Sequence, residues 1–343
     1  MNPAFVQHAY FGASPVQSRI VHPADEGFSP QDLYVVAVYS NPVMYRTRAK
    51  LFLDFKERML RAGVSLVIVE CTYGDRPYLL TDENEPLHFR VRLDSELWVK
   101  ESLINYAVAR LPSDWKYVAW VDADVAWQRD DWPMLTLDKL QHHPVVQMWQ
   151  HAVDLGPNTE TMQLHTSFGC RYHEELVATA GEGRRKKKYE DAKFGHPGYA
   201  WAMRRDAFEA VGGLVDFAIV GSGDHHMATA IVGRALDSVP QGLHPNYLTL
   251  LKAWETRAVE ALDADLGFLP VTILHYFHGK KKDRGYQSRW SILTKLQFDP
   301  LVHVRKTWDG IACLSTQAPK ARALREQLRK YFRSRNEDSV DAE

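Results

Sequence analysis

Two aspartates separated by one residue, Asp122 and Asp124, stand in the apolar stretch 117–125 (YVAWVDADV). A continuous apolar run of this length is typical of a buried strand, in which residues i and i+2 share a face. Because buried charges are costly unless they are paired, we expect both carboxylates at the strand's end, facing a cation. Two hard oxygen ligands suit Mg²⁺ or Mn²⁺ carrying a substrate phosphate. The alternative is that an aspartate here caps the following turn or helix.

A third aspartate, Asp224, follows the glycine-rich segment 221–223 and precedes a predicted helix over 227–233. The glycines permit close backbone approach. A carboxylate at the mouth of a pocket can act as a general base that removes a proton from an acceptor hydroxyl. The alternative is that Asp224 is a helix N-cap.

Two histidines, His275 and His278, lie at the end of a predicted apolar strand and are followed by a run of cations at positions 280–282 and 284. Imidazole is a good ligand for Mn²⁺ beside carboxylates. The cations can neutralise phosphate oxygens. A structural histidine beside a solvated basic turn is the alternative, but the combination of histidine, glycine and four cations favours a site.

The predicted elements bring these residues together. We expect strands over 33–39, 64–70 and the 117–125 stretch, with helices over 46–62, capped by Gly63, and over 97–111. Strands alternating with helices predict an open parallel sheet, and such sheets bind ligands beyond the carboxyl ends of their strands. Tyr39, Ser40 and Asn41 lie at one such end and the aspartate pair at another. The sequence therefore predicts a binding site there.

Composition excludes several other classes. The chain has 343 residues and a formal net charge of −1, so no global field marks a nucleic-acid-binding protein. Three separated cysteines argue against a disulfide framework or a cysteine zinc site and favour a cytoplasmic location. We expect no signal peptide and no membrane span, because no matching apolar segment is present. Dinucleotide and P-loop folds are disfavoured, because neither glycine motif follows a strand.

The order of these features resembles the metal-dependent GT-A glycosyltransferases, in particular the inverting β-1,4-galactosyltransferase and chondroitin-polymerase type. The order is strand, Asp-x-Asp, a Gly-Gly segment leading to Gly-x-Gly-Asp, then His-Gly-Lys-Lys, over roughly residues 33–290. The resemblance implies an α/β GT-A fold with an open, mostly parallel sheet flanked by helices. The whole chain is also similar to a group of GT-A-like proteins of bacteria and phages.

The resemblance implies a role for each matched residue. Mn²⁺ (or Mg²⁺) would be held by Asp122, Asp124 and His278, with His275 as the alternative ligand, and Asp224 would be the catalytic base. Donor binding is implied for Tyr39, Ser40, Asn41, Lys100, Lys280 and Lys281. Acceptor contacts are implied for Trp201, Gly213, Gly223 and His225. Gly223 stands where the family usually has an acidic residue, which leaves the acceptor type open.

Three parts are expected along the chain. Residues 1–30 form an irregular arm, residues 31–300 the catalytic domain, and residues 301–343 a helical extension with an acidic tail. The catalytic domain divides into a nucleotide-sugar half (31–150) and an acceptor half (151–300). Within the latter, residues 153–197 are expected to be loop-like. Their basic run 184–188 is either a lid over the donor or a solvated turn.

The predicted function is transfer of a sugar from a nucleotide-diphosphate sugar, a UDP-sugar by preference, to an acceptor hydroxyl with inversion. The acceptor is a glycan, a small molecule or hydroxymethylpyrimidine in phage-type DNA. Three basic clusters, at 184–188, 280–284 and 322–335, are compatible with DNA. The alternatives are a metal-dependent nucleotidyltransferase that uses the same carboxylates and a non-catalytic carbohydrate- or DNA-binding module. The sequence does not indicate an oligomeric state.

Overall fold

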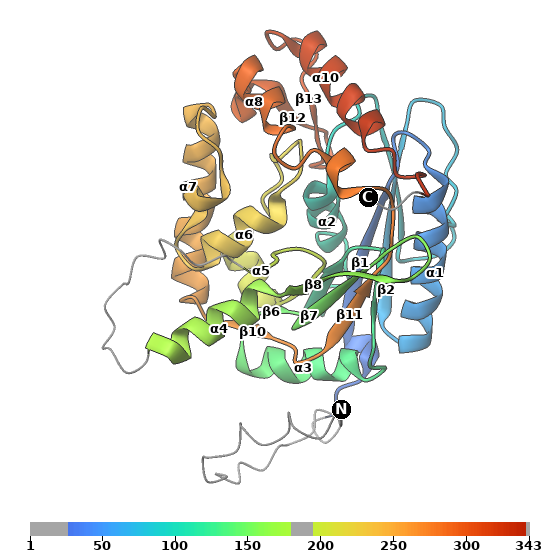
Figure 1. Ribbon diagram of the computed structural model, residues 1–343, viewed down its shortest axis with the longest axis vertical. Coiled ribbons are helices and arrows are strands. Elements are labelled where there is room, and N and C mark those ends of the chain that lie inside the picture. The colour runs from blue at the N-terminus through green and yellow to red at the C-terminus, as the bar shows by residue number, and fades with distance from the viewer. Residues whose placement is uncertain (1–26, 180–194, 341–343) are drawn as a thin grey trace, which may run out of the picture.

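The computed structural model describes residues 27–179 and 195–340, so most of the predicted arm and the whole basic run 184–188 lie outside the described residues. Its main feature is a central sheet with helices around it (Figure 1). The sheet has seven strands in the order β10-β6-β9-β4-β1-β2-β3. Neighbouring strands run parallel except where β9 pairs with β6 and β4. The strands are β1 (Leu33–Ser40), β2 (Ser65–Tyr73), β3 (His88–Leu93), β4 (Tyr117–Val121), β6 (Val145–Gln147), β9 (Ala200–Arg204) and β10 (Leu266–Phe268).

The remaining strands form two smaller sheets. A four-stranded sheet has the order β5-β11-β7-β8, and β12 pairs with β13. Their bounds are β5 (Val125–Trp127), β7 (His151–Leu155), β8 (Thr161–Thr166), β11 (Thr272–His275), β12 (Val304–Lys306) and β13 (Ala312–Leu314). Strand β11 is an inner strand of the four-stranded sheet, antiparallel to β5 and parallel to β7.

Ten α-helices are found in the described ranges 27–179 and 195–340. They are α1 (Arg46–Ala62), α2 (Lys100–Val108), α3 (Trp132–His142), α4 (Phe168–Thr179), α5 (Arg205–Val211), α6 (Gly223–Ile231), α7 (Pro245–Leu262), α8 (Trp290–Leu296), α9 (Pro300–His303) and α10 (Ala321–Ser334). Short 3₁₀ turns are η2 (Pro30–Asp32), η3 (Ala235–Ser238) and η4 (Lys281–Arg284). None of the helices in these ranges combines the length and the apolar character needed to cross a membrane.

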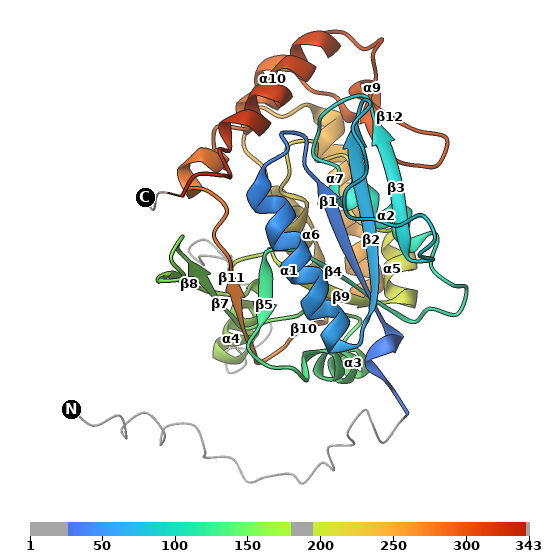
Figure 2. The same ribbon diagram turned by 90° about the vertical axis from the view of Figure 1, so that its right-hand side faces the viewer.

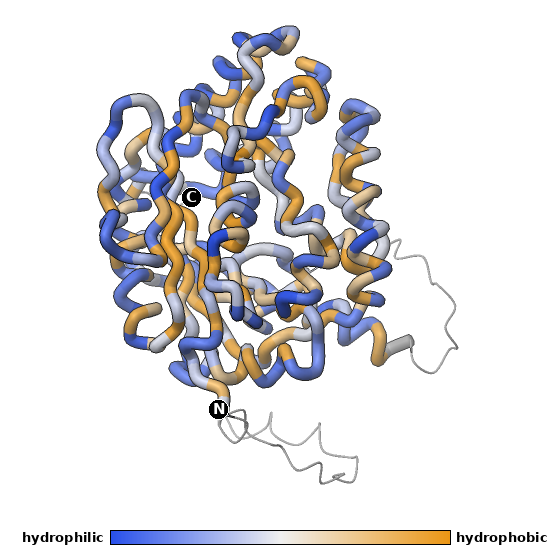
Figure 3. The backbone as a smooth tube through the Cα atoms, turned by 180° about the vertical axis from the view of Figure 1, so that it is seen from behind, coloured by the Kyte–Doolittle hydropathy of each residue, from blue (hydrophilic) through white to orange (hydrophobic). Residues whose placement is uncertain are grey.

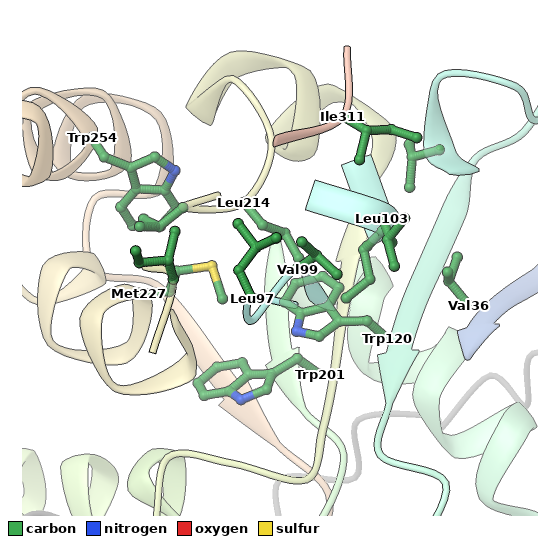
Figure 4. Packing of buried hydrophobic residues seen from close by; sticks show 14 of the residues in the cluster. Val36, Leu97, Val99, Leu103, Trp120, Trp201, Leu214, Met227, Trp254 and Ile311 are labelled. Atoms are coloured by element: carbon green, nitrogen blue, oxygen red, sulfur yellow. The ribbon is translucent and has the colours of Figure 1, made fainter. Parts of the chain in front are cut away.

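Helices cover both faces of the main sheet, so its central strands β1 and β4 are largely apolar. Val35 of β1 belongs to the same buried cluster as Phe52 of α1, and Figure 2 shows α1 lying across this face. Val36, on the opposite face, packs in a second cluster with Leu103 of α2 and Trp120 of β4 (Figure 4). The central strands accordingly form an apolar band in Figure 3. This is an α/β architecture with an open, mostly parallel sheet flanked by helices, which confirms that prediction.

Helix α1 confirms the predicted helix over 46–62. Phe52, Phe55 and Met59 recur at helical spacing and are its buried residues. Gly63 follows in the left-handed region, with φ of 73°, as the predicted C-cap.

The chain changes direction in the sheet beside β1. Strands β2 and β3 lie on one side of β1, whereas the next strand, β4, lies on its other side. Such a switch point leaves a crevice outside the carboxyl ends of the two strands, and open α/β sheets bind ligands there. Strand β1 ends at Ser40 and strand β4 at Val121, so the segments that follow both strands begin at this crevice.

Three expectations about elements need correction. Residues 153–197 were expected to be loop-like, but part of β7, all of β8 and α4 form within them, because β7 and β8 pair as an antiparallel hairpin. Strand β3 follows β2 and was not predicted. Its polar and apolar residues alternate, as is usual in an edge strand that pairs with one neighbour, so it lacks the apolar run by which the other strands were predicted. Strand β4 ends at Val121, and Val125 begins β5 in the other sheet.

The C-terminal segment packs onto the N-terminal end of α1. Helix α10 buries one apolar face, made by Leu324, Leu328, Tyr331 and Phe332. Beyond it, the backbone N–H of Asn336 donates to the hydroxyl of Tyr45 at 3.0 Å. The Asp338 carboxylate accepts from the backbone N–H groups of Arg46 (3.0 Å) and Thr47 (2.8 Å), where the helix dipole favours negative charge.

Candidate functional site

A cavity of about 570 Å³ lies at the switch point, beyond the carboxyl ends of β1 and β4. Ten of the residues predicted for the site line it: Tyr39, Ser40, Asn41, Lys100, Asp122, Asp124, Asp224, His225, His278 and Lys281. Lys280 lines a smaller neighbouring cavity instead. The remaining three predicted residues, Trp201, Gly213 and Gly223, are not part of the wall of the large cavity.

Asp124, His275 and His278 bring potential metal-ligand atoms close together, and they are called the metal-ligand group below. One potential ligand atom from each lies within 4.8 Å of the others. Nε2 of His278 lies 2.9 Å from Oδ2 of Asp124, and Nε2 of His275 lies 3.9 Å from the same oxygen. The structure thus brings both histidines to Asp124, whereas the sequence had left His275 as the alternative to His278.

Asp122 and Asp124 form hydrogen bonds with different partners. The reason is the early end of β4, which places the pair in a turn between two sheets. The Asp124 carbonyl accepts from the backbone N–H of Tyr276 at 2.8 Å and so joins the histidine segment. The Asp122 carboxylate accepts instead from Nζ of Lys100, at 2.9 Å.

A buried carboxylate, Asp154, orients His275 from behind. Its Oδ1 lies 2.8 Å from Nδ1 of His275 and accepts from the Tyr199 hydroxyl at 2.9 Å. Burial acts to raise the pKa of Asp154, but hydrogen bonds from His165 and His275 outweigh it and hold the pKa below its usual range. An ionised carboxylate only accepts, so Nδ1 of His275 carries the proton and Nε2 is left for a metal.

The residues present fit a divalent cation of the Mn²⁺ type. Oδ1 of Asp124 and Nδ1 of His278 are buried with no hydrogen-bond partner among the described residues. Burial acts to raise the pKa of Asp124, but His278 and His275 outweigh it and lower the pKa below its usual range. Burial and the charge of Arg284 lower the pKa of His278 to about 4. A carboxylate oxygen beside two imidazole nitrogens is a donor set that Mn²⁺ accepts.

Lys100 connects the metal-ligand side of the cavity to Asp224. Its Nζ donates to Oδ1 of Asp122 and to Oδ2 of Asp224, both at 2.9 Å. Burial opposes the charge on Lys100, but Asp122 and Asp224 outweigh it and raise its pKa well above the ordinary value. Oδ1 of Asp224 is buried and has no partner among the described residues. One carboxylate oxygen of Asp224 is therefore held in place while the other remains available.

Helix α6 begins at Gly223 and so sets the position of Asp224. A Cβ on Gly223 would lie 2.3 Å from Oε1 of Glu101, so the buried Glu101 side chain would have to shift. Burial raises the pKa of Glu101 to about 8, with Lys100 acting in the opposite direction. A neutral carboxyl group thus packs directly against the backbone that carries Asp224.

Two predicted acceptor residues have structural partners elsewhere. Trp201 is 2% exposed, packs in the core shown in Figure 4, and donates from Nε1 to the carbonyl of Pro197 at 2.7 Å. Gly213 has φ of 77° at the end of α5, and its missing side chain makes room for Asn105. His225, in contrast, lines the cavity beside Asp224.

Part of the cavity wall is formed by residues that were not predicted from the sequence. Phe332, Arg335 and Glu337 of the C-terminal segment line the cavity. Glu337 is fully buried and forms ion pairs with Arg48 and Arg335. Its Oε2 lies 4.0 Å from Nδ1 of His278. The C-terminal segment therefore contributes to the cavity wall.

Comparisons with known proteins give only distant similarities. No family model matches the chain, and no curated protein matches it. Two structures of Drosophila β-1,4-galactosyltransferase 7 are similar at 16% identity and a TM-score of 0.30, over 60% of this chain and 61% of that one. One contains xylobiose, and the other contains manganese, UDP-Gal and xylobiose. The chain thus spans about 61% of the length of that enzyme's structure.

A bacterial protein from Desulfovibrio desulfuricans G20, assigned by name to the nucleotide-diphospho-sugar transferases, is similar over more of its length. The identity is 11% and the TM-score 0.28, over 88% of this chain and 98% of that one. Similarities of this size do not decide what the present chain does, which has to be inferred from its own side chains.

Proposed function

We propose that this chain is a metal-dependent glycosyltransferase of the GT-A type. It would transfer a sugar from a nucleotide-diphosphate sugar, a UDP-sugar by preference, to an acceptor hydroxyl with inversion. The observation that carries this proposal is one cavity that holds a metal-ligand group at Asp124 and a carboxylate with a free oxygen at Asp224. A switch point between β1 and β4 is where such sheets bind nucleotides.

The metal-ligand group defines the donor side. Asp124, His275 and His278 would hold the ion, and Asp122 would join them only by leaving Lys100. When bound, a divalent cation offsets the charge that develops on a leaving diphosphate. Lys281 and Arg284 line the same part of the wall and supply further positive charge. Lys281 also forms an ion pair with Asp154 at 2.5 Å, which ties it to the residue behind His275.

Asp224 defines the acceptor side. Its free Oδ1 would accept the acceptor's proton while the hydroxyl oxygen attacks the anomeric carbon. A single displacement of this kind inverts the anomeric configuration. Lys100 holds Oδ2 and so orients the carboxylate, and its second bond to Asp122 couples the base to the donor side. The acceptor would be a glycan, a small molecule or hydroxymethylpyrimidine in DNA.

Donor binding tests the first half of the proposal. Thermal-shift titration with UDP-sugars should show stabilisation that requires Mn²⁺ and disappears with EDTA. Asp124→Asn should abolish the metal-dependent part. Asp206→Asn is the matched control, because the Asp206 side chain is 69% exposed and pairs with Arg204 on the surface. If no nucleotide sugar binds, or if EDTA changes nothing, the proposal is wrong.

Transfer tests the second half. Asp224→Asn should retain donor binding but lose transfer by a factor of about 10²–10⁴, the usual contribution of a general base. Transfer at the wild-type rate would show that the base lies elsewhere. Incubation with a sugar 1-phosphate and a nucleoside triphosphate covers the nucleotidyltransferase alternative, since only that activity would release pyrophosphate.

A further inference from the structure

Two buried arginines in the cavity wall form no ion pair with a carboxylate among the residues that the structure describes, although burial normally demands one. Arg284 is 6% exposed and Arg289 is 7% exposed, and both line the large cavity. A guanidinium group offers five N–H donors. Among the described residues, Arg284 uses one of them, to the Tyr286 hydroxyl, and Arg289 uses two, to Ser222 and Tyr331. All of these partners are hydroxyl groups, and Nε of each arginine has no hydrogen-bond partner within residues 27–179 and 195–340.

The two arginines serve different ends of the cavity. Arg284 lies near the metal-ligand group, since its charge contributes to lowering the pKa of both Asp124 and His278. Arg289 lies at the turn that leads to Asp224. Its Nη2 donates to the Ser222 hydroxyl at 2.5 Å, two residues before that carboxylate.

The walls around Arg289 are aromatic as well as cationic. A Cβ on Gly221 would lie 3.2 Å from Nη1 of Arg289 and 3.3 Å from the ring of Trp98, so both side chains crowd the same turn. The Arg289 guanidinium also lies 5.2 Å from the ring centroid of Tyr286. Burial and the charge of Arg289 lower the pKa of His225, which keeps this neighbour neutral. An incoming ligand therefore meets one uncompensated cation between flat apolar surfaces.

We propose that Arg289 is the anion-binding residue of the acceptor subsite, so that the acceptor carries a phosphate or carboxylate group close to the hydroxyl that reacts. The acceptor assignment rests on the proposed function, because Asp224 marks the acceptor side only if it is the base. A buried cation without a counter-charge is costly, and an anionic ligand removes that cost through charge-assisted, bidentate hydrogen bonds. A neutral acceptor would leave the cost in place.

Calorimetric titration of the full chain, without metal or nucleotide sugar, tests the subsite independently of turnover. The probes are methyl phosphate, methyl glucuronide and the neutral methyl glucoside. One of the two anions should bind saturably and the glucoside should not, and which anion binds distinguishes a phosphate-bearing from a carboxylate-bearing acceptor. Arg289→Gln should weaken anion binding by about 10- to 100-fold, as expected for hydrogen bonds between charged groups.

Further variants keep the result interpretable. Arg289→Lys retains the charge but loses the planar fork, so it should bind with intermediate affinity, and thermal unfolding checks that both variants fold. Arg322→Gln is the matched control, because this side chain is 93% exposed and pairs with Glu326 on the surface of α10. Anion binding that survives in Arg289→Gln overturns the proposal, because Arg289 would then not bind the anion. Anion binding that is lost in Arg284→Gln instead also overturns it, because the anion would then belong to the donor side.

Assays with Mn²⁺ and UDP-sugars separate this inference from the proposed function. If the wild type turns over a UDP-sugar but transfers equally well to charged and neutral acceptors, the subsite is refuted while the function stands. If an anion binds through Arg289 but no nucleotide sugar is bound or cleaved, the anion site stands and its assignment to an acceptor falls with the function.

Discussion

Replacing Asp154 by asparagine tests whether His275 is held ready for a metal. The substitution preserves size but removes the charge that accepts from His275, Tyr199 and His165. One amide oxygen can still accept from His275, so the ring is loosened rather than released. Loss of such a supporting carboxylate costs about 10- to 100-fold in metal affinity, or about 1.4–2.7 kcal/mol.

Titration with Mn²⁺, followed by the paramagnetic resonance signal of the free ion, measures this affinity without any substrate. Asp154→Asn should bind Mn²⁺ at least ten times more weakly than the wild type, and Asp206→Asn should bind it equally well. An affinity within twofold of the wild type for Asp154→Asn would refute the reasoning. It would mean that the hydrogen bond at 2.8 Å does not orient His275 as a ligand.

Three further outcomes are expected. Glu337→Gln removes the counter-charge of the buried Arg335 and the partly buried Arg48, and should lower the free energy of unfolding by about 3–5 kcal/mol in urea titrations. Glu326→Gln on the surface should change it by under about 0.5 kcal/mol. Burial lowers the pKa of His226 from 6.5 to about 3, so between these values the unfolded chain binds one proton more than the native chain. Stability should therefore fall as pH decreases, with about 1.4 kcal/mol per pH unit coming from this residue, and His226→Gln should show a shallower slope. Gly223→Ala should reduce both the rate of sugar transfer and the free energy of unfolding, because its Cβ would overlap the Glu101 carboxyl group. An unchanged transfer rate would contradict this and would show that α6 can shift without cost.

Local patterns predicted the elements that build the site. Helix α1 and its glycine cap follow from apolar spacing within one stretch of sequence, and the structure reproduces their bounds. The position of the aspartate pair at a sheet edge followed from strand order alone. The end of β4 was misplaced because Val125 continues the apolar run while pairing with a different sheet.

Partnerships across long separations were not predictable from one sequence. Lys100 meets Asp224 across 124 positions, and Asp154 meets His275 across 121. No spacing rule connects such pairs, because the fold and not the local backbone brings them together. Asp154 was further hidden in a segment whose short hairpin strands resemble a polar loop. Arg289 was visible as a cation, but only its burial without a carboxylate distinguishes it from a surface residue.

The place of Glu337 in the cavity wall has a consequence for how the protein is made. This residue pairs with Arg48, 289 positions earlier in the chain. Ribosomes add about 5–20 residues per second, so synthesis runs on for roughly 10–40 s after Asp124 has been made before Glu337 exists. During that interval the nascent chain carries Asp124 but lacks the C-terminal part of the cavity wall. A premature stop codon before this point would yield a long, nearly complete polypeptide with an open site.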